Sequence, residues 1–368
     1  MKKKPMDYPI FITTIILVCF GIVMVFSSSF YMAQHNERIQ DSYYFLKTQS
    51  QWAVVGLVAM IIMSNFSYWR LKKYANIMLI VIIGLLVALL IFGKPINNAK
   101  RWFVIAGISI QPSEIAKFGL IIYLSASISR NKDRLKRPIT GFGYYLAITG
   151  LIFVLIFMQP NLSTASSIVM LALVILFVGG AKILHLGALA GLGISGIVLL
   201  LQNVDHTDYR VKRYLTFLDP WADPLDDGFQ VIQSLYALGS GGLFGMGLGQ
   251  SRQKFLFLPY AETDFIFAII GEELGFVGGS LVMVLFLILI WRGIRIALTA
   301  PDLFGCLLAT GITAAIGIQT VINIAVVTSS MPATGLPLPF ISAGGSSLAF
   351  FMASIGLLLN ISKYCETT

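Results

Sequence analysis

Repeated apolar runs, each long enough to cross a membrane, decide what this chain can fold into. Polar or basic residues separate the runs, which lie at about 9–31, 45–66, 74–92, 112–129, 141–158, 161–180, 184–201, 263–291, 303–328 and 341–361. A helix of about 20 apolar residues crosses about 30 Å of hydrocarbon. Only 12% of the 368 residues are charged, against about 25% in soluble domains. The sequence therefore predicts an all-α polytopic membrane protein with about ten transmembrane helices, folded as a single domain over residues 1–368.

The positions of lysine and arginine predict the orientation of these helices. Basic residues gather in alternate loops, as is typical of cytoplasmic segments: Lys2, Lys3, Lys4, Arg70, Lys72, Lys73, Arg130, Lys132, Arg134, Lys136, Arg137, Lys182, Arg292, Arg295 and Lys363. Both termini are thus expected in the cytoplasm. This topology accounts for the net charge of +9, so no nucleic-acid partner is predicted. The three cysteines have no paired or metal-binding spacing, and no disulfide or zinc site is expected.

A long polar segment, residues 202–262, is predicted on the outer face between the seventh and eighth helices. It combines mixed charge with aromatic residues, an apolar stretch at 229–238 and a glycine-rich stretch at 239–249. Disordered segments are poor in aromatic residues, so an ordered re-entrant or interfacial element is favoured over disorder. The glycines would allow backbone N–H groups to approach an anion, and close packing of a re-entrant backbone explains them equally well.

Ionisable residues inside the spans are costly and point to candidate sites. Glu114 and Lys117 lie three residues apart, on one face of the fourth helix. Two interpretations stay open: a buried ion pair that fixes helix packing, or the lining of a polar cavity with Lys117 available to a phosphate. Asp264 lies at the start of the eighth helix. Its position alone favours the interpretation that its carboxylate complements the helix dipole, with Thr263 as a cap. At least one of Glu272 and Glu273, deeper in that helix, should have a polar partner inside the bundle.

Two further features belong to the outer face. Basic residues occur there against the general trend and either pair with the long loop's own acids or hold an anionic head group such as a pyrophosphate: Lys94, Lys100, Arg101, Arg210, Lys212, Arg213, Arg252 and Lys254. The segment 331–340 contains three prolines, which place irregular backbone at membrane depth. Such backbone must be buried in protein or line a wet cavity, so a loop that folds back beneath the outer mouth is expected.

Several motifs, in this order along nearly the whole chain, resemble the SEDS family (shape, elongation, division and sporulation), and most closely its division and sporulation branch. They are Lys100-Arg101-Trp102, Gln111-Pro112-Ser113-Glu114, Trp221-Ala222-Asp223-Pro224, Gly228-Phe229-Gln230, Gln233-Ser234-Leu235, the run 247–254, Leu258-Pro259, Thr263-Asp264-Phe265-Ile266-Phe267-Ala268, Gly271-Glu272-Glu273-Leu274-Gly275 and Gly344-Gly345-Ser346-Ser347.

The resemblance implies a peptidoglycan glycosyltransferase that polymerises lipid II (undecaprenyl-pyrophosphate-linked disaccharide pentapeptide) on the outer face of the cytoplasmic membrane. It also implies a class B penicillin-binding protein as partner. The family's catalytic aspartate falls on Asp264, which would act as general base of an inverting transfer. A divalent cation at the pyrophosphate is compatible with this reading, without assigned ligands. The candidate substrate-binding residues are Arg101, Glu114, Lys117, Arg210, Lys254 and Ser346.

The chain departs from the family pattern at a few positions. Asn161 stands where the family commonly has aspartate, Tyr260 follows Leu-Pro in place of glutamate or glutamine, and Ala343 replaces a tyrosine. A role for a carboxylate at position 161 is therefore in doubt. Two other functions stay open. A lipid II flippase would use the same cavity and cations, and needs charge in the path but no base. A scaffold would recruit and activate a transpeptidase, with its own chemistry secondary or lost. An ion channel is disfavoured because no inverted repeat is evident.

Overall fold

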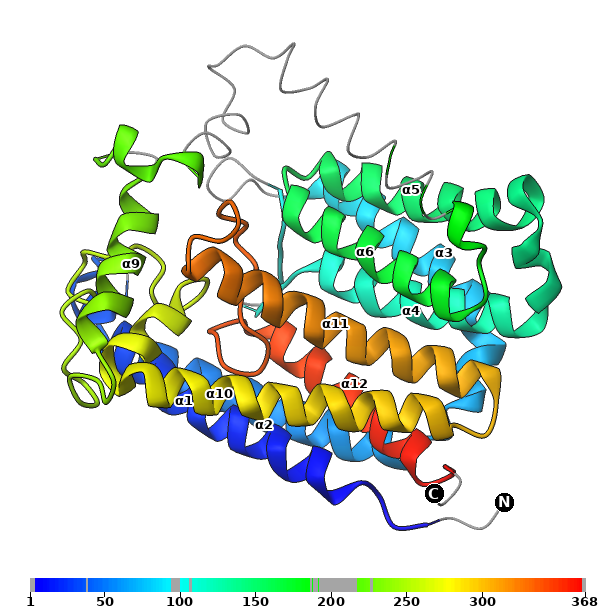
Figure 1. Ribbon diagram of the computed structural model, residues 1–368, viewed down its shortest axis with the longest axis horizontal. Helices are drawn as coiled ribbons and strands as arrows, with labels where there is room; N and C mark the ends of the chain where they lie inside the picture. Colours follow the sequence, from blue (N-terminus) through cyan, green and yellow to red (C-terminus); the bar gives the residue numbers. More distant parts are fainter. Residues whose placement is uncertain are drawn as a thin grey trace.

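The expected apolar runs form long helices in the computed structural model (Figure 1). The structure describes residues 4–37, 39–93, 100–105, 108–185, 187, 191, 217–225 and 228–365. The helices of the bundle in this part of the chain are α1 (Tyr8–His35), α2 (Tyr44–Asn65), α3 (Trp69–Phe92), α4 (Pro112–Arg130), α5 (Tyr144–Phe157), α6 (Leu162–Val178), α10 (Ile266–Thr299), α11 (Leu303–Val327) and α12 (Ser346–Ser362).

These helices confirm the polytopic, helical fold class. Within the described ranges, six helices are long and apolar enough to cross a membrane, and α6 and α12 are shorter apolar helices. The seventh expected span, residues 184–201, lies almost wholly outside the described residues, so the count of ten stays a prediction. A short 3-10 helix (Lys132–Lys136) and a π-helical turn (Pro138–Gly143) lead into α5.

Helix α11 occupies the centre of the bundle. It packs against α10, α6, α4 and α12, while α2 pairs with α12 and α3 with α4. In its most apolar stretch, 67% of α11 is buried inside the protein, against 22% for α2. Polar side chains on α11 therefore face protein rather than lipid. Their hydrogen-bonding groups need partners inside the protein, because lipid supplies none.

Smaller elements cover one end of the bundle. Strands β1 (Phe103–Ile105) and β2 (Ile108–Ile110) form an antiparallel hairpin with Phe103 opposite Ile110. The long segment before α10 contains a 3-10 turn (Pro220–Ala222) and helix α9 (Phe229–Gly241), which packs against α10. The predicted ordered element at 229–238 is confirmed as α9.

Helix α10 changes direction at a glycine. Gly275 has φ +68° and ψ −167°, outside the helical region. A Cβ atom at this position would lie 2.3 Å from the backbone nitrogen of Gly245 and 2.6 Å from the carbonyl oxygen of Leu243. Only glycine permits both this conformation and this approach. The eighth span was expected at 263–291, and α10 instead begins at Ile266 and continues to Thr299.

The two ends of the chain lie side by side. The backbone N–H of Lys4 donates to the carbonyl oxygen of Lys363 at 2.9 Å, and Asp7 pairs with Arg292 at 2.6 Å. Figure 1 shows both ends together, with α10 beginning at the opposite end of the bundle. Residues near the start of α10 are thus separated from the termini by the length of the helices.

Candidate active site

Asp264 lies in a turn before α10 rather than in the first turn of the helix. Phe265 is the N-cap residue of the helix, and no side chain in the described ranges caps it. The hydroxyl of Thr263 donates to the carbonyl oxygen of Tyr260 at 3.2 Å, so the expected Thr263 cap is wrong. Asp264 is half-buried. A Cβ atom on Gly335 would lie 3.4 Å from its carboxylate oxygen Oδ2, which places the carboxylate against the backbone of the three-proline loop.

A second carboxyl group shares this turn. Glu262 is only 6% exposed. Burial, and to a smaller extent the nearby charge of Asp264, raise the pKa of Glu262 above its usual value, because a desolvated carboxylate is disfavoured. The turn thus combines a half-exposed carboxylate with a buried carboxyl group that holds its proton more tightly.

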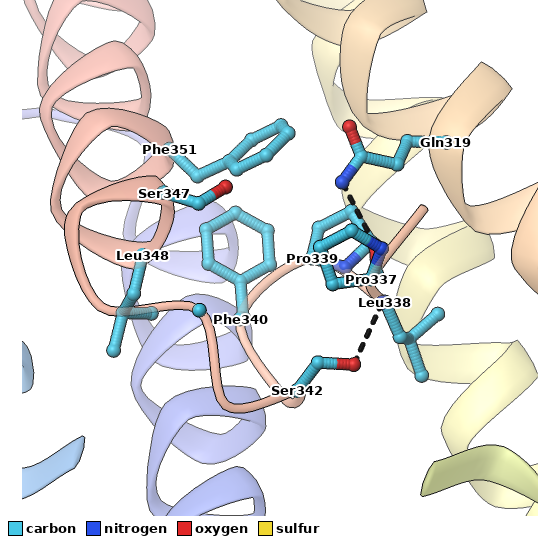
Figure 2. Close-up of a pocket in the computed structure, with 10 residues that line it drawn as sticks. Gln319, Pro337, Leu338, Pro339, Phe340, Ser342, Ser347, Leu348 and Phe351 are labelled. Atoms are coloured by element: carbon cyan, nitrogen blue, oxygen red, sulfur yellow. Dashed lines mark hydrogen bonds between the residues drawn. The ribbon is translucent and has the colours of Figure 1, made fainter. Parts of the chain in front are cut away.

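The three-proline loop folds back into the protein, as expected. Leu336, Leu338, Phe340 and Ile341 are buried. The Nε2 atom of Gln319 donates to the carbonyl oxygen of Pro337, and the N–H of Leu338 donates to Ser342 Oγ, both at 2.8 Å (Figure 2). Irregular backbone is therefore tolerated here because α11 and the loop itself satisfy its polar groups.

Glu114 and Lys117 form the ion pair that their spacing predicts. The ammonium group of Lys117 lies 3.0 Å from both carboxylate oxygens of Glu114 and donates to Gln319 Oε1 at 2.7 Å. The Ser347 hydroxyl donates to Glu114 at 3.1 Å. Both charged side chains are buried. The charges are thus neutralised inside the bundle, which is the arrangement that the packing interpretation requires.

A pocket lies beside this ion pair, between α11, α12 and the three-proline loop (Figure 2). Its lining includes Gln319, Phe340, Ser347 and Phe351. Ser346, the predicted substrate-binding serine, is not among the lining residues. It is 2% exposed, and no group in the described part of the chain forms a hydrogen bond with its hydroxyl. The structure therefore brings Ser347, rather than Ser346, to the charged pair.

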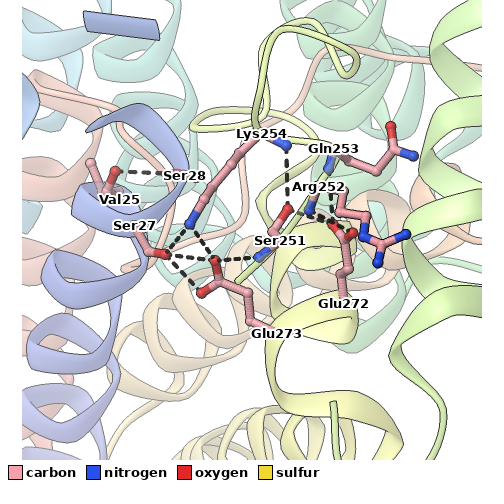
Figure 3. A network of polar contacts seen from close by, with 9 residues as sticks. All are labelled: Val25, Ser27, Ser28, Ser251, Arg252, Gln253, Lys254, Glu272 and Glu273. Atoms are coloured by element: carbon pink, nitrogen blue, oxygen red, sulfur yellow. Dashed lines mark hydrogen bonds and ion pairs between the residues drawn. The ribbon is translucent and has the colours of Figure 1, made fainter. Parts of the chain in front are cut away.

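Glu272 and Glu273 both have polar partners inside the bundle, as expected for at least one of them. Glu272 accepts from the Ser251 hydroxyl and from the N–H of Arg252 at 2.9 Å. Glu273 accepts from the Ser27 hydroxyl at 2.7 Å and pairs with Lys254 at 3.0 Å (Figure 3). Through these contacts, the two carboxylates of α10 hold residues 251–254 against α1 and α10, ahead of the turn that carries Asp264.

The basic residues that the sequence predicts on the outer face have different kinds of partner. Lys254 is buried in its pair with Glu273, which belongs to α10 and is not one of the acids of the long loop. The Arg101 guanidinium donates to the carbonyl oxygen of Pro160. The neighbouring Asn161 accepts from the N–H of Thr164 at 3.4 Å and caps α6, so this asparagine has a structural role of its own. Arg210 lies outside the described residues.

Close packing explains part of the glycine-rich stretch. A Cβ atom on Gly241 would lie 1.9 Å from the carbonyl oxygen of Gly271, and one on Gly245 would lie 2.2 Å from that of Glu273. These glycines let the end of α9 and the chain directly after it lie on the backbone of α10. Of the two interpretations left open, the structure favours packing over an anion cradle at these positions.

Sequence reasoning missed Asn323 on α11. Its Nδ2 atom donates to the carbonyl oxygens of Asp264 and Leu336, both at 2.8 Å. Asn323 is 1% exposed. The signal available in the sequence was an amide inside an apolar span, where polar side chains act as interhelical hydrogen-bonding groups. In the described part of the chain, no three His, Cys, Asp or Glu side chains are grouped so as to hold a metal ion.

Known proteins resemble this chain over nearly its whole length. Residues 8–367 match the FtsW, RodA and SpoVE model, described as cell cycle protein. Stage V sporulation protein E of Bacillus subtilis is 45% identical over 99% of this chain and 98% of its own length. A probable peptidoglycan glycosyltransferase FtsW of a Geobacter species is 40% identical, over 97% of this chain and 96% of its own.

Solved structures extend this similarity to the fold. A chain of a peptidoglycan synthase complex, in work on the structural coordination of polymerization and crosslinking, aligns with a TM-score of 0.80 at 30% identity, over 97% of both chains. The rod shape determining protein RodA of Thermus thermophilus aligns with a TM-score of 0.71 at 27% identity, over 98% of both chains. The overall arrangement of the helices is therefore shared with these proteins.

Proposed function

Because this chain belongs to the FtsW, RodA and SpoVE family, the SEDS family that its motifs resemble, we propose that it is a peptidoglycan glycosyltransferase that polymerises lipid II into β-1,4 glycan strands during division or sporulation. The observation that carries the proposal is the full-length match to relatives bearing the name of this activity. The geometry adds a half-exposed carboxylate, Asp264, held in a turn at one end of the bundle.

Asp264 is the proposed general base. The 4-hydroxyl of one lipid II GlcNAc gives its proton to the Asp264 carboxylate as its oxygen attacks the MurNAc anomeric carbon of a second lipid II. The new bond joins that oxygen to the carbon, and the broken bond releases undecaprenyl pyrophosphate with the electron pair. Conversion of an α-linked phosphate to a β-glycoside inverts the carbon, so one base and stabilisation of the leaving phosphate suffice.

The leaving pyrophosphate needs positive charge, and the outer-face cations differ in how well they suit this role. Arg101 and Arg210 are the proposed pyrophosphate ligands. Lys117 and Lys254 would have to leave Glu114 and Glu273 to bind a phosphate, so we assign them to holding the architecture of the site. A divalent cation would be carried mainly by the phosphates with one or two carboxylates, and no step above depends on it.

The proposed setting is the cytoplasmic membrane, with both termini in the cytoplasm and Asp264 on the outer face. The termini lie next to each other, and α10 begins at the opposite end of the bundle, which supports placing the termini and Asp264 on opposite sides of the membrane (Figure 1). The basic loops favour the cytoplasm for the side of the termini. The proposed partner is a class B penicillin-binding protein. The similarity to a chain of a peptidoglycan synthase complex supports this partner.

The test is lipid II polymerisation by the purified protein in liposomes, with and without its transpeptidase and with divalent metal present. The wild type should produce glycan strands and Asp264→Asn should produce none. Asp41→Asn, which removes an exposed carboxylate paired with Lys47, should polymerise normally. Strand synthesis by Asp264→Asn would reject the assignment of the base. A wild type that transports lipid II or activates the partner without making strands would instead favour a flippase or a scaffold.

A further inference from the structure

Three consecutive carbonyl groups in the turn that carries Asp264 are held by a distant part of the chain. The carbonyl oxygen of Glu262 accepts from the N–H of Ala343 at 2.9 Å, and that of Thr263 accepts from the Ser342 hydroxyl at 2.6 Å. The carbonyl oxygen of Asp264 accepts from Asn323 at 2.8 Å. All three precede Phe265, whose carbonyl is the first that an intrahelical bond can reach.

The donors are themselves fixed. Ser342 Oγ accepts from the N–H of Leu338 at 2.8 Å (Figure 2). The same hydroxyl donates to the carbonyl oxygen of Thr263, so both of its hydrogen-bonding functions are used. The carbonyl oxygen of Ser342 accepts from Gln49 Nε2 on α2 at 3.1 Å. Asn323 bridges Asp264 and Leu336. Ser342 and Asn323 are 4% and 1% exposed, so water does not replace these bonds.

We propose that Asn323 and Ser342 are positioning residues for Asp264, an inference that rests on the function proposed above. They hold the backbone of residues 262–264 outside the helix and so fix the direction in which the carboxylate of Asp264 points. A carboxylate that must meet a substrate hydroxyl at hydrogen-bond distance loses much of its effect when it moves by about 1 Å. The segment before α12, which supplies the hydrogen bonds from Ser342 and Ala343, also faces the carboxylate of Asp264 through Gly335.

The experiment compares Ser342→Ala and Asn323→Ala with wild type, Asp264→Asn and a matched control. Asn360→Ala is the control, because Asn360 is also a buried asparagine that bridges two backbone groups, Tyr68 and Ser64, but near the chain ends. For lipid II polymerisation, both positioning variants should lower kcat by about 10- to 100-fold with KM within about twofold of wild type. Ser342→Thr, which keeps the hydroxyl, should recover most of the rate. The control should keep its kcat.

Hydrogen–deuterium exchange gives a second readout that needs no activity. Amides of residues 258–268 should exchange at least about tenfold faster in Ser342→Ala and Asn323→Ala, and at the wild-type rate in Asn360→Ala, because freeing the carbonyls lets the turn open. Unchanged exchange together with wild-type kcat would overturn the positioning role. A wild type that makes no strands would reject the proposed function, and an active Asp264→Asn would reject the assignment of Asp264 as the base. In either case the exchange rates would still decide whether the turn is held as described.

Discussion

Removing one member of the buried Glu114–Lys117 pair should cost far more stability than removing both. The ammonium lies 3.0 Å from both Glu114 oxygens and 2.7 Å from Gln319, and the two side chains are 1% and 3% exposed. Lys117→Met alone leaves a carboxylate without its counter-ion, and Glu114→Gln alone leaves an ammonium. Each single change should destabilise the protein by about 3–5 kcal/mol, whereas replacing both charges should be close to neutral.

Denaturant unfolding in detergent micelles measures these losses for the single and double variants as a double-mutant cycle. The exposed pair of Asp41 and Lys47, at 2.8 Å, is the matched control, and its replacement should change stability little because solvent screens it. The reasoning is refuted if Lys117→Met unfolds at the wild-type midpoint but makes no glycan strands. That outcome would assign the lysine to substrate rather than to packing.

Three other substitutions test separate contacts. Gly245 has φ +81°, and a Cβ atom on it would lie 2.2 Å from the carbonyl oxygen of Glu273. Gly245→Ala should therefore lower the free energy of unfolding by about 1–3 kcal/mol from backbone strain alone. Gly239→Ala should not, because a Cβ atom there meets nothing within 4 Å in the described part of the chain. Glu273→Gln should cost about 3 kcal/mol in the same assay because Lys254 keeps a buried charge, and adding Lys254→Met should restore much of it. Because the pKa of Glu262 is raised above 4.5 in the folded protein, stability should fall as pH rises from that value through the folded pKa; Glu262→Gln should flatten this decline, and an unchanged pH profile would contradict it.

The membrane spans could be predicted because burial in lipid imposes a length and a composition on each helix. The differences occur where the backbone responds to contacts that hydropathy does not record. Helix α10 bends at Gly275 because the chain near Gly245 lies on it. Helix α12 begins at Ser346 rather than at the expected 341, because Phe340 and Ile341 are buried in the loop before it.

The candidate site was predictable only where its residues are neighbours in sequence. Glu114 and Lys117 meet because three residues separate them on one helix. The partners of Glu273 come from two distant segments, Ser27 on α1 and Lys254 before α10, and no local rule connects them. Asn323 and Ser342 reach the turn of Asp264 only through the tertiary fold. The sequence shows an amide inside an apolar span at position 323, but it does not show which backbone groups that amide holds.

One face of α11 connects the buried ion pair to the turn of Asp264. Gln319 and Asn323 lie four residues apart, hence one turn apart on the same face. Gln319 accepts from Lys117 and donates to the carbonyl oxygen of Pro337, and Asn323 donates to the carbonyl oxygens of Leu336 and Asp264. The three-proline loop is therefore held at two consecutive carbonyls by two side chains of one helix.

The residues that let α11 span the membrane differ from the residues of α11 that hold the candidate site. Replacing Gln319 or Asn323 with an apolar residue would leave α11 apolar enough to span, since the rest of the helix already does so. The same replacement would leave buried carbonyl groups of the loop without hydrogen-bond donors. Each such carbonyl lowers the free energy of unfolding by more than good apolar packing adds to it. The side-chain amide of Gln319 contacts the ion pair and the three-proline loop, and that of Asn323 contacts the same loop and the turn of Asp264. A substitution of Lys117 should therefore affect the position of Asp264 through Gln319 and the loop rather than along α10.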